Sequence, residues 1–153
     1  MSVSLSIVCP KCDALNRMPR ERLSESRKAV CGKCKAPLFP GQPIALDELA
    51  RFDKHIKDND IPLLVDFWAP WCGPCLMMAP EFSKAAAGLE PRMRLAKVNT
   101  ELVQEVGARY GIRAIPTMIA FQHGREIARQ SGAMQAPGII RFAESALAGT
   151  SGD

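Results

Sequence analysis

The sequence lacks any long hydrophobic run, which limits where the chain is expected to act. No stretch approaches the roughly 18 uninterrupted apolar residues that a membrane-spanning helix needs. Residues 1–8 also lack the basic segment and the long apolar run of a secretory signal peptide. We therefore expect a protein of the reducing cytoplasm with no membrane contact, where cysteines serve as metal ligands or redox catalysts rather than in structural disulfides.

Aromatic residues and surplus charge are also scarce. Aromatics make up 6% of the chain, and the net charge is only +4 over 153 residues. Nucleic-acid-binding surfaces usually concentrate basic charge and interleave aromatic side chains with it. The basic segment 1–40 has a single aromatic residue, Phe39. We expect no nucleic-acid binding, although a recognition role for this segment remains an alternative hypothesis.

The six cysteines divide the chain into two parts. Four of them lie within the first 34 residues, whereas Cys72 and Cys75 stand alone further on. Residues 1–40 contain few large apolar side chains and many Lys and Arg residues, so we expect them to build no hydrophobic core of their own. The turn-rich segment 39–43 reads as a linker. These observations predict one small domain over residues 1–40 and a second over residues 41–153.

The first four cysteines have the spacing of a structural zinc site. They form two Cys-x-x-Cys knuckles, Cys9 with Cys12 and Cys31 with Cys34, separated by 18 residues. Two such knuckles can place four thiolates around one Zn²⁺, and the metal would supply most of the folding free energy here. Four thiolates with Zn²⁺ carry a formal charge of −2, which nearby cations would soften: Lys11, Arg17, Lys33 and Lys35.

Other interpretations of this quartet remain open. Two disulfides, four free thiols or a Cys₄ iron site would use the same residues. The two histidines are not needed as ligands. His55 on a predicted helix and His123 in a predicted turn are expected to be solvated.

Strand and helix patterns alternate through the rest of the chain. Strands are predicted at residues 42–46, 62–68, 93–98, 117–122 and 125–130. Helices are predicted from Asp47, as the N-cap, to residue 58, over 73–88 with a kink at Pro80, and over 101–110 and 136–148. Gly124 supplies the positive φ of a two-residue hairpin turn. This pattern predicts an α/β domain with a central mixed β-sheet flanked by helices.

Cys72 and Cys75 form the most specific chemical motif of the sequence. They flank Gly73 and Pro74 at a predicted strand-to-helix junction. The helix start favours the thiolate form of Cys72, and Cys75 lies one turn further in, less open to solvent. We predict that Cys72 attacks a disulfide and that Cys75 resolves the mixed disulfide. A buried cysteine pair or half of a metal site is the alternative, but the other four cysteines already make a complete ligand set.

Two charged residues interrupt the predicted buried strands. Asp66 lies within the apolar run 62–68, and Lys97 lies within the next strand. Burial should raise the pKa of Asp66, which suits a general base that takes the proton of Cys75, with Lys97 as its partner. The alternative is an aspartate on a solvated face.

Several segments resemble the thioredoxin family. The run from Phe67 to Cys75, Phe-Trp-Ala-Pro-Trp-Cys-Gly-Pro-Cys, is followed by Pro80, as in a thioredoxin active site. The later run 110–117, Tyr-Gly-Ile-Arg-Ala-Ile-Pro-Thr, is similar to the loop that carries the family's cis-proline. Gly124 and the pair Gly132-Ala133 also match, so that the resemblance covers roughly residues 42–149. With the cysteine quartet, the chain resembles the zinc-containing, thioredoxin 2 type.

This resemblance implies a fold, a site and a reaction. The expected architecture is a thioredoxin fold plus a small N-terminal zinc ribbon, acting as a monomeric protein-disulfide reductase. Pro116 would be cis and lie against the cysteine pair. A shallow groove for client proteins would be lined by Trp71, Gly73, Pro74, Ile115, Pro116 and Gly132. NADPH would supply electrons through the flavoprotein thioredoxin reductase, in the electron transport that maintains cell redox homeostasis.

Three questions stay open at the level of the sequence. Leu76 stands where many thioredoxins carry a basic residue, which could change partner choice. An oxidant or isomerase of the same fold is an alternative, although Gly73-Pro74 argues against it. The zinc site is either purely structural or also an oxidation sensor that releases zinc when its thiolates oxidise.

Overall fold

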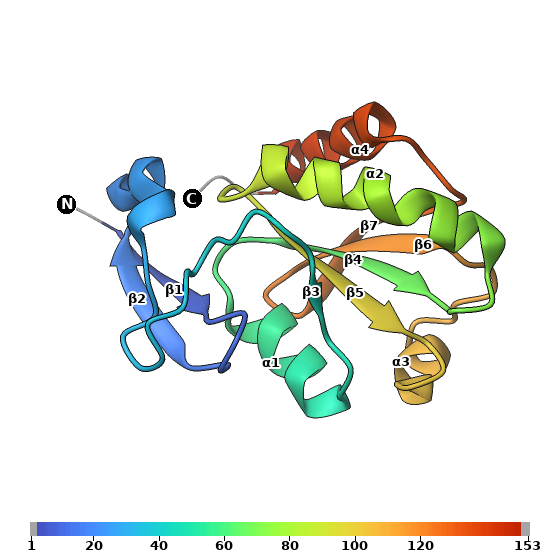
Figure 1. Ribbon diagram of the computed structural model, residues 1–153, viewed down its shortest axis with the longest axis horizontal. Coiled ribbons are helices and arrows are strands. Elements are labelled where there is room, and N and C mark those ends of the chain that lie inside the picture. The colour runs from blue at the N-terminus through green and yellow to red at the C-terminus, as the bar shows by residue number, and fades with distance from the viewer. Residues whose placement is uncertain (1–2, 151–153) are drawn as a thin grey trace.

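Two β-sheets of different size organise the computed structural model, which describes residues 3–150 (Figure 1). The small sheet pairs β1 with β2, and the large sheet has the order β3-β5-β4-β6-β7. The strands are β1 (Ser4–Val8), β2 (Leu15–Pro19), β3 (Ile44–Ala45), β4 (Leu63–Trp68), β5 (Arg94–Asn99), β6 (Thr117–Gln122) and β7 (Arg125–Ser131). The predicted strand 42–46 is thus reduced to two residues at the sheet edge.

The large sheet is mixed, as the sequence predicted. β4 lies at its centre, parallel to β5 and antiparallel to β6, and β7 continues the sheet antiparallel to β6. A central strand has both faces covered, which explains the continuous apolar run that encodes β4. His123 and Gly124 join β6 to β7 with φ angles of 51° and 83°, the backbone that a two-residue hairpin turn requires.

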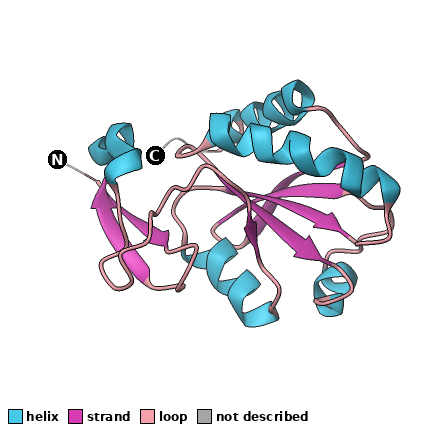
Figure 2. Cartoon of the chain, in the orientation of Figure 1, coloured by secondary structure: helices cyan, strands magenta, loops and turns pink. Residues whose placement is uncertain are grey.

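Within residues 3–150, four α-helices cover the two faces of the large sheet (Figure 2). They are α1 (Leu49–Asp58), α2 (Gly73–Leu89), α3 (Gln104–Arg109) and α4 (Ala136–Ala148). Val65 and Phe67 of β4 belong to the core layer that includes α1 and α3. Leu64 belongs to the layer under α2 and α4. Because side chains alternate along a strand, Asp66 points to the same face as Leu64, beneath the helix that carries Cys75.

Some local expectations about the helices are wrong. Asp47 is not the N-cap of α1, because Glu48 holds that position and makes no side-chain capping bond. The helix predicted over 101–110 begins only at Gln104, after a turn closed by bonds from Leu102 and Val103 to the Asn99 carbonyl. α2 contains Pro80 within a single helix, and the kink expected at this residue stays a prediction. None of the helices within residues 3–150 is both long and apolar enough to cross a membrane.

The amino-terminal region is more structured than its composition indicated. β1 and β2 are followed by the 3₁₀ helix η1 (Arg20–Lys28) and by a bridge between Val30 and Pro37. The expectation that this region builds no core is wrong, because a small apolar cluster lies under the cysteines. Its buried members are Leu5, Ile7, Cys9, Met18, Cys31, Leu38, Phe39 and Ile61. Ile61 comes from beyond the ribbon, so the cluster is completed by the segment that leads into β4.

Candidate functional site

Cys72 lies at the junction between the central strand and the longest helix. It is the N-cap of α2, and its Sγ accepts a hydrogen bond from the backbone N–H of Cys75 at 3.2 Å. The two cysteines form a disulfide, with their Cα atoms 5.2 Å apart. In this oxidised form they hardly differ in exposure, at 4% for Cys72 and 2% for Cys75. The position at the helix start, rather than exposure, therefore distinguishes Cys72 from its partner.

An open apolar rim surrounds the disulfide. Trp71 is 70% exposed, and Gly73 and Pro74 are exposed beside it. A Cβ atom added to Gly73 would meet nothing within 4 Å, so the backbone here is open to an approaching chain. Leu76 and Met77 extend the apolar surface along the first turns of α2. The sequence analysis did not assign these two residues to the groove. Their position directly after the Cys72–Cys75 motif, as two apolar residues in a row, could have indicated it.

The segment around Pro116 closes the other side of the site. The Ile115–Pro116 peptide bond is cis, as the family resemblance implied. The Ile115 carbonyl lies 3.7 Å from Cys72 Sγ, and Ile115 packs on the buried cysteine pair. Gly132 has a φ of 100° and donates its N–H to the Pro116 carbonyl at 2.9 Å. The structure thus brings the residues predicted for the groove together around one disulfide.

Asp66 is fully buried, so the alternative of a solvated aspartate is wrong. Neither carboxylate oxygen has a hydrogen-bond partner among residues 3–150. Burial raises the pKa of Asp66 to about 7, with the positive charge of Lys97 opposing the shift. Lys97 is the direct neighbour of Asp66 on β5, and its Nζ lies 4.6 Å from the centre of the Trp68 ring. The two intruding charges are therefore a cross-strand pair, as their placement in the sequence suggested.

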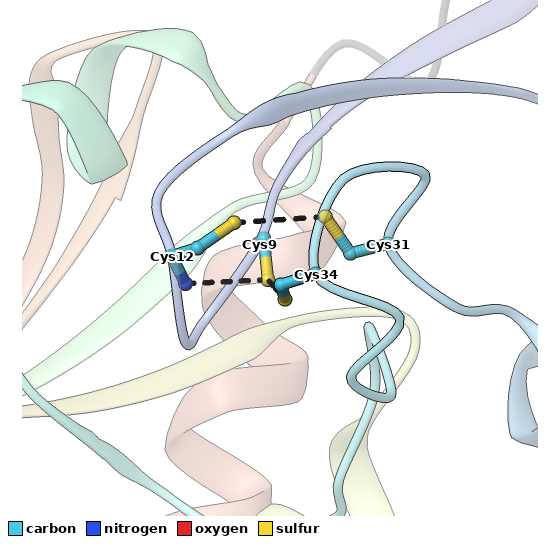
Figure 3. A group of neighbouring side chains, drawn as sticks. All are labelled: Cys9, Cys12, Cys31 and Cys34. Carbon is cyan, nitrogen blue, oxygen red and sulfur yellow. Dashed lines mark hydrogen bonds between the residues drawn. The ribbon is translucent and has the colours of Figure 1, made fainter.

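The four amino-terminal cysteines converge from two separate loops (Figure 3). Their sulfur atoms all lie within 4.8 Å of one another, with 3.6 Å between Cys9 and Cys34 and 3.7 Å between Cys12 and Cys31. A tetrahedral zinc with bonds of about 2.3 Å to sulfur separates its ligands by about 3.8 Å. None of the four is in a disulfide. The sulfur positions therefore fit one zinc ion and contradict the two-disulfide alternative.

Hydrogen-bond donors around these sulfurs suit thiolates. The backbone N–H groups of Lys11 and Cys12 point to Cys9 Sγ at 3.4 and 3.5 Å, and the Asn16 side chain donates to Cys31 Sγ at 3.5 Å. The pKa of the Cys31 thiol is lowered to about 6, chiefly by the backbone N–H of Cys34 and then by Asn16, whereas burial and the neighbouring cysteines raise the pKa of Cys12 to about 11. Metal ligation requires deprotonated cysteines, so this donor set favours a metal centre.

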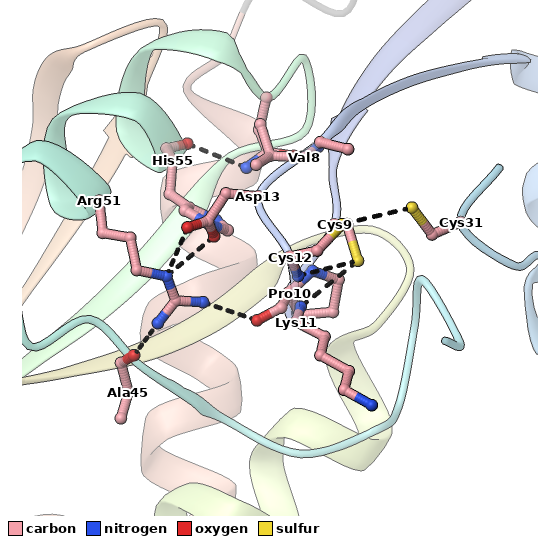
Figure 4. A network of polar contacts seen from close by, with 12 residues as sticks. Val8, Cys9, Pro10, Lys11, Cys12, Asp13, Cys31, Ala45, Arg51 and His55 are labelled. Carbon is pink, nitrogen blue, oxygen red and sulfur yellow. Dashed lines mark hydrogen bonds and ion pairs between the residues drawn. The ribbon is translucent and has the colours of Figure 1, made fainter. Parts of the chain in front are cut away.

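A network of polar contacts joins the first knuckle to α1 (Figure 4). Asp13 accepts two hydrogen bonds from Arg51 Nε, at 2.8 and 2.9 Å, and lies 2.7 Å from His55 Nε2. Arg51 also donates to the carbonyls of Pro10 and Ala45. Arg51 of α1 therefore ties the first knuckle of the ribbon to β3 of the larger sheet.

His55 contradicts the expectation of a solvated histidine. Its side chain is fully buried, and burial lowers its pKa to about 4 although Asp13 opposes the shift. The imidazole is therefore neutral near pH 7 and donates Nε2–H to the Asp13 carboxylate. His123 is exposed as predicted and lies 3.1 Å from Asp60.

Arg94 was missed by the sequence interpretation. It is the first residue of β5 and is fully buried. A charged residue within a predicted buried strand had already marked Asp66 and Lys97 as candidates. Arg94 meets the same criterion, because it lies within the predicted strand 93–98.

Comparisons with known proteins match both parts of the chain. A thioredoxin family model matches residues 43–145, and a model described as the amino-terminal part of thioredoxin 2 matches residues 8–36. Thioredoxin C-3 of Corynebacterium nephridii is 42% identical over 129 residues, which are 84% of this chain and 86% of that protein. Thioredoxin 1 of a Nostoc species is 45% identical over 83 residues, or 54% of this chain and 78% of that protein.

A solved structure shows the same fold. A mutant thioredoxin from Halobacterium salinarum aligns with a TM-score of 0.63 at 29% identity, over 71% of this chain and 93% of that one. This likeness supports the thioredoxin fold of the larger part of the chain. The chain therefore belongs to the thioredoxin family of thiol–disulfide oxidoreductases, in the type that carries an amino-terminal zinc ribbon.

Proposed function

We propose that this protein reduces disulfide bonds of client proteins through Cys72 and Cys75. The Cys72 thiolate attacks one sulfur of the client disulfide, which forms a mixed disulfide and releases one client thiolate. The Cys75 thiolate then attacks Cys72 Sγ and releases the second client thiolate. The client gains two electrons, and the protein is left with the Cys72–Cys75 disulfide. The observation that carries this proposal is the placement of Cys72 at the start of α2, bonded to Cys75 one turn on.

The client binds on the apolar rim of the disulfide. Trp71, Gly73 and Pro74 border one side, whereas Ile115, Pro116 and Gly132 border the other. The open space at Gly73 and at Gly132 allows a client backbone to come close to Cys72. A shallow apolar surface with few charges suits clients that differ in sequence, since little of the contact depends on matching charges.

Asp66 takes the proton of Cys75 during the second step. Its pKa of about 7 lets it accept and return a proton near neutral pH, which is what a general base requires. Lys97 keeps part of the population ionised by its positive charge. Asp66 lies in the sheet beneath α2, the helix that carries Cys75. The titrations of these two groups are therefore expected to be coupled.

The oxidised protein is recycled by thioredoxin reductase, a flavoprotein that takes electrons from NADPH. The support is membership of the thioredoxin family. The same membership supports a place in cytoplasmic redox homeostasis, with the protein acting as a monomer. A reduction potential near −270 mV fits this role, whereas one near the −120 mV of DsbA would indicate an oxidant.

One zinc ion is held by Cys9, Cys12, Cys31 and Cys34, and its role is structural. Zinc supplies a cross-link between the two knuckles and neutralises part of the thiolate charge. The domain boundary is placed after residue 40, between the ribbon and the thioredoxin domain.

Insulin reduction tests this proposal. With dithiothreitol as the electron donor, the wild-type protein should accelerate the reduction, and Cys72→Ser should abolish the acceleration while retaining zinc and fold. With NADPH and thioredoxin reductase as the donor system, turnover of the wild type would support the recycling step. Near wild-type turnover of Cys72→Ser would contradict the assigned nucleophile. Wild-type activity with dithiothreitol but none with NADPH and thioredoxin reductase would contradict only the recycling partner.

A further inference from the structure

Arg94 is the one fully buried Lys or Arg side chain among residues 3–150. It starts β5 in the larger sheet, and its backbone N–H donates to the Pro62 carbonyl at 2.9 Å. Its guanidinium carbon lies 5.2 Å from the centre of the Phe39 ring. Phe39 belongs to the apolar cluster that contains Cys9 and Cys31, so Arg94 reaches the underside of the ribbon from the thioredoxin domain.

The hydrogen-bonding groups of the Arg94 guanidinium are only partly satisfied. Glu90 binds Nη1 at 2.7 Å and also accepts the N–H of Gly41 at 2.6 Å. The other two guanidinium nitrogens, Nε and Nη2, have no hydrogen-bond partner in the part of the chain that the structure describes. A buried cation normally has all its donors satisfied and its charge balanced. Glu90 balances the charge, and the two unpartnered nitrogens leave Arg94 able to interact with a further acceptor or negative group.

The cysteine quartet is such a group. Burial lowers the pKa of Arg94, and the negative charge of Glu90 opposes this shift most, with a smaller contribution from Cys9 in the same direction. Arg94 also contributes to the lowered pKa of His55, whose Nδ1 is a second buried atom without a partner among residues 3–150. Beside Phe39 of the ribbon cluster, the Arg94 nitrogens Nε and Nη2 are thus buried donors without a partner among residues 3–150.

The exposed cations near the quartet stabilise its negative charge less than a buried cation would. Lys11, Arg17, Lys33 and Lys35 are all exposed, so water and salt weaken their effect. An interaction at an effective dielectric constant of about 20, typical of protein sites, is about fourfold stronger than in bulk water at the same distance. A zinc ion with four thiolates has a formal charge of −2, which a buried cation stabilises most.

We propose that Arg94 is the buried counter-charge of the four-cysteine metal centre, so that tight zinc binding by the ribbon depends on a side chain of the thioredoxin domain. Arg94 is a positioning residue in this role, because it acts on the metal through the cysteine ligands. Residues around metal ligands commonly change metal affinity by about 10- to 100-fold when they are removed.

Competition with a zinc-binding dye tests this proposal on the full-length, zinc-loaded protein. Arg94→Met should lower the zinc affinity at least about tenfold. Arg94→Lys keeps the positive charge and should retain the affinity to within a few-fold. Arg92→Met is the matched control, because Arg92 lies two residues away, is 52% exposed and pairs with Glu144 on the surface. Its zinc affinity should equal that of the wild type.

Two results would overturn the proposal. One is an unchanged zinc affinity in Arg94→Met. The other is an equal loss in Arg94→Met and Arg94→Lys, which would show that packing rather than charge matters. If Arg94→Met fails to fold because Glu90 is left unpaired, Arg94→Met with Glu90→Gln removes both charges together, and its zinc affinity decides the question by the same criterion.

Discussion

Two single buried charges carry the roles proposed for this protein. Asp66 and Arg94 are both fully buried, yet they serve different parts of the molecule. Asp66 has no hydrogen-bond partner within residues 3–150 and lies beneath the helix of Cys75, which fits a group that must exchange a proton. Arg94 has one ion pair, and its other two nitrogens have no partner within residues 3–150, which fits the fixed positive charge proposed above.

Asp66→Asn should stabilise the protein increasingly as the pH rises. Since the pKa of Asp66 is about 7 when folded and near 3.8 when unfolded, the native state binds more protons between these values. Raising the pH therefore weakens the wild type relative to the variant. The gain in the free energy of unfolding should grow by about 2 to 3 kcal/mol between pH 5 and pH 8.

Guanidinium unfolding of both proteins at the two pH values measures this change. The exposed Asp58→Asn exchange is the matched control. A gain for Asp66→Asn that is equal at pH 5 and pH 8 would contradict the raised pKa of Asp66.

At the scale of elements, the start of α2 and the end of α1 have separate tasks. α2 presents Cys72 and holds Cys75 beneath it. The end of α1 anchors the ribbon, because buried Asn59 accepts the N–H of Val8 in β1 at 2.8 Å and donates to the His55 carbonyl at 2.9 Å. Asp60 continues this contact with two hydrogen bonds to the Ser6 backbone. β1 is thus attached to the segment between α1 and β4 over several residues.

Asn59→Ala should weaken this attachment. The change leaves the buried N–H of Val8 without an acceptor, which costs about 1 to 3 kcal/mol of stability. Hydrogen exchange at the Val8 amide should also become faster. Asp58→Ala, at the exposed neighbouring position, should change the stability by no more than about 0.5 kcal/mol. Equal stability of the two variants would show that Asn59 does not hold the ribbon in place.

At the scale of the whole molecule, the protein joins two parts with different sources of stability. The thioredoxin domain has two apolar layers around a five-stranded sheet. The ribbon has one small cluster that Ile61 completes from outside, so metal binding must supply much of its folding free energy.

Removal of zinc with a chelator should therefore affect the two parts unequally. Backbone amides within residues 8–36 should lose most of their protection from hydrogen exchange, because the two knuckles are no longer linked. Amides of β4 and β6 should remain protected, and insulin reduction with dithiothreitol should continue. Unchanged protection of residues 8–36 after complete metal removal would contradict a structural role of the metal.

The sequence predicted the features that short motifs and strong periodicity encode. The cysteine spacings, the central strand over 62–68 and the intruding Asp66 each carry a local signal that needs no knowledge of the fold. The burial of His55 could not be predicted in this way, because it depends on Asp13, which lies 42 positions earlier in the chain. The core under the ribbon was missed for a similar reason, since Ile61 contributes to it from a distant segment.

Trapping of the mixed disulfide tests most directly whether Cys72 attacks and Cys75 resolves. Reduced Cys75→Ser, mixed with insulin whose disulfides are intact, should accumulate a mixed disulfide through Cys72. Mass spectrometry detects this adduct, and dithiothreitol removes it. Cys72→Ser, treated in the same way, should give no such adduct. Formation of the adduct at Cys75 in Cys72→Ser, at the rate seen for Cys75→Ser, would contradict the assignment of the two cysteines.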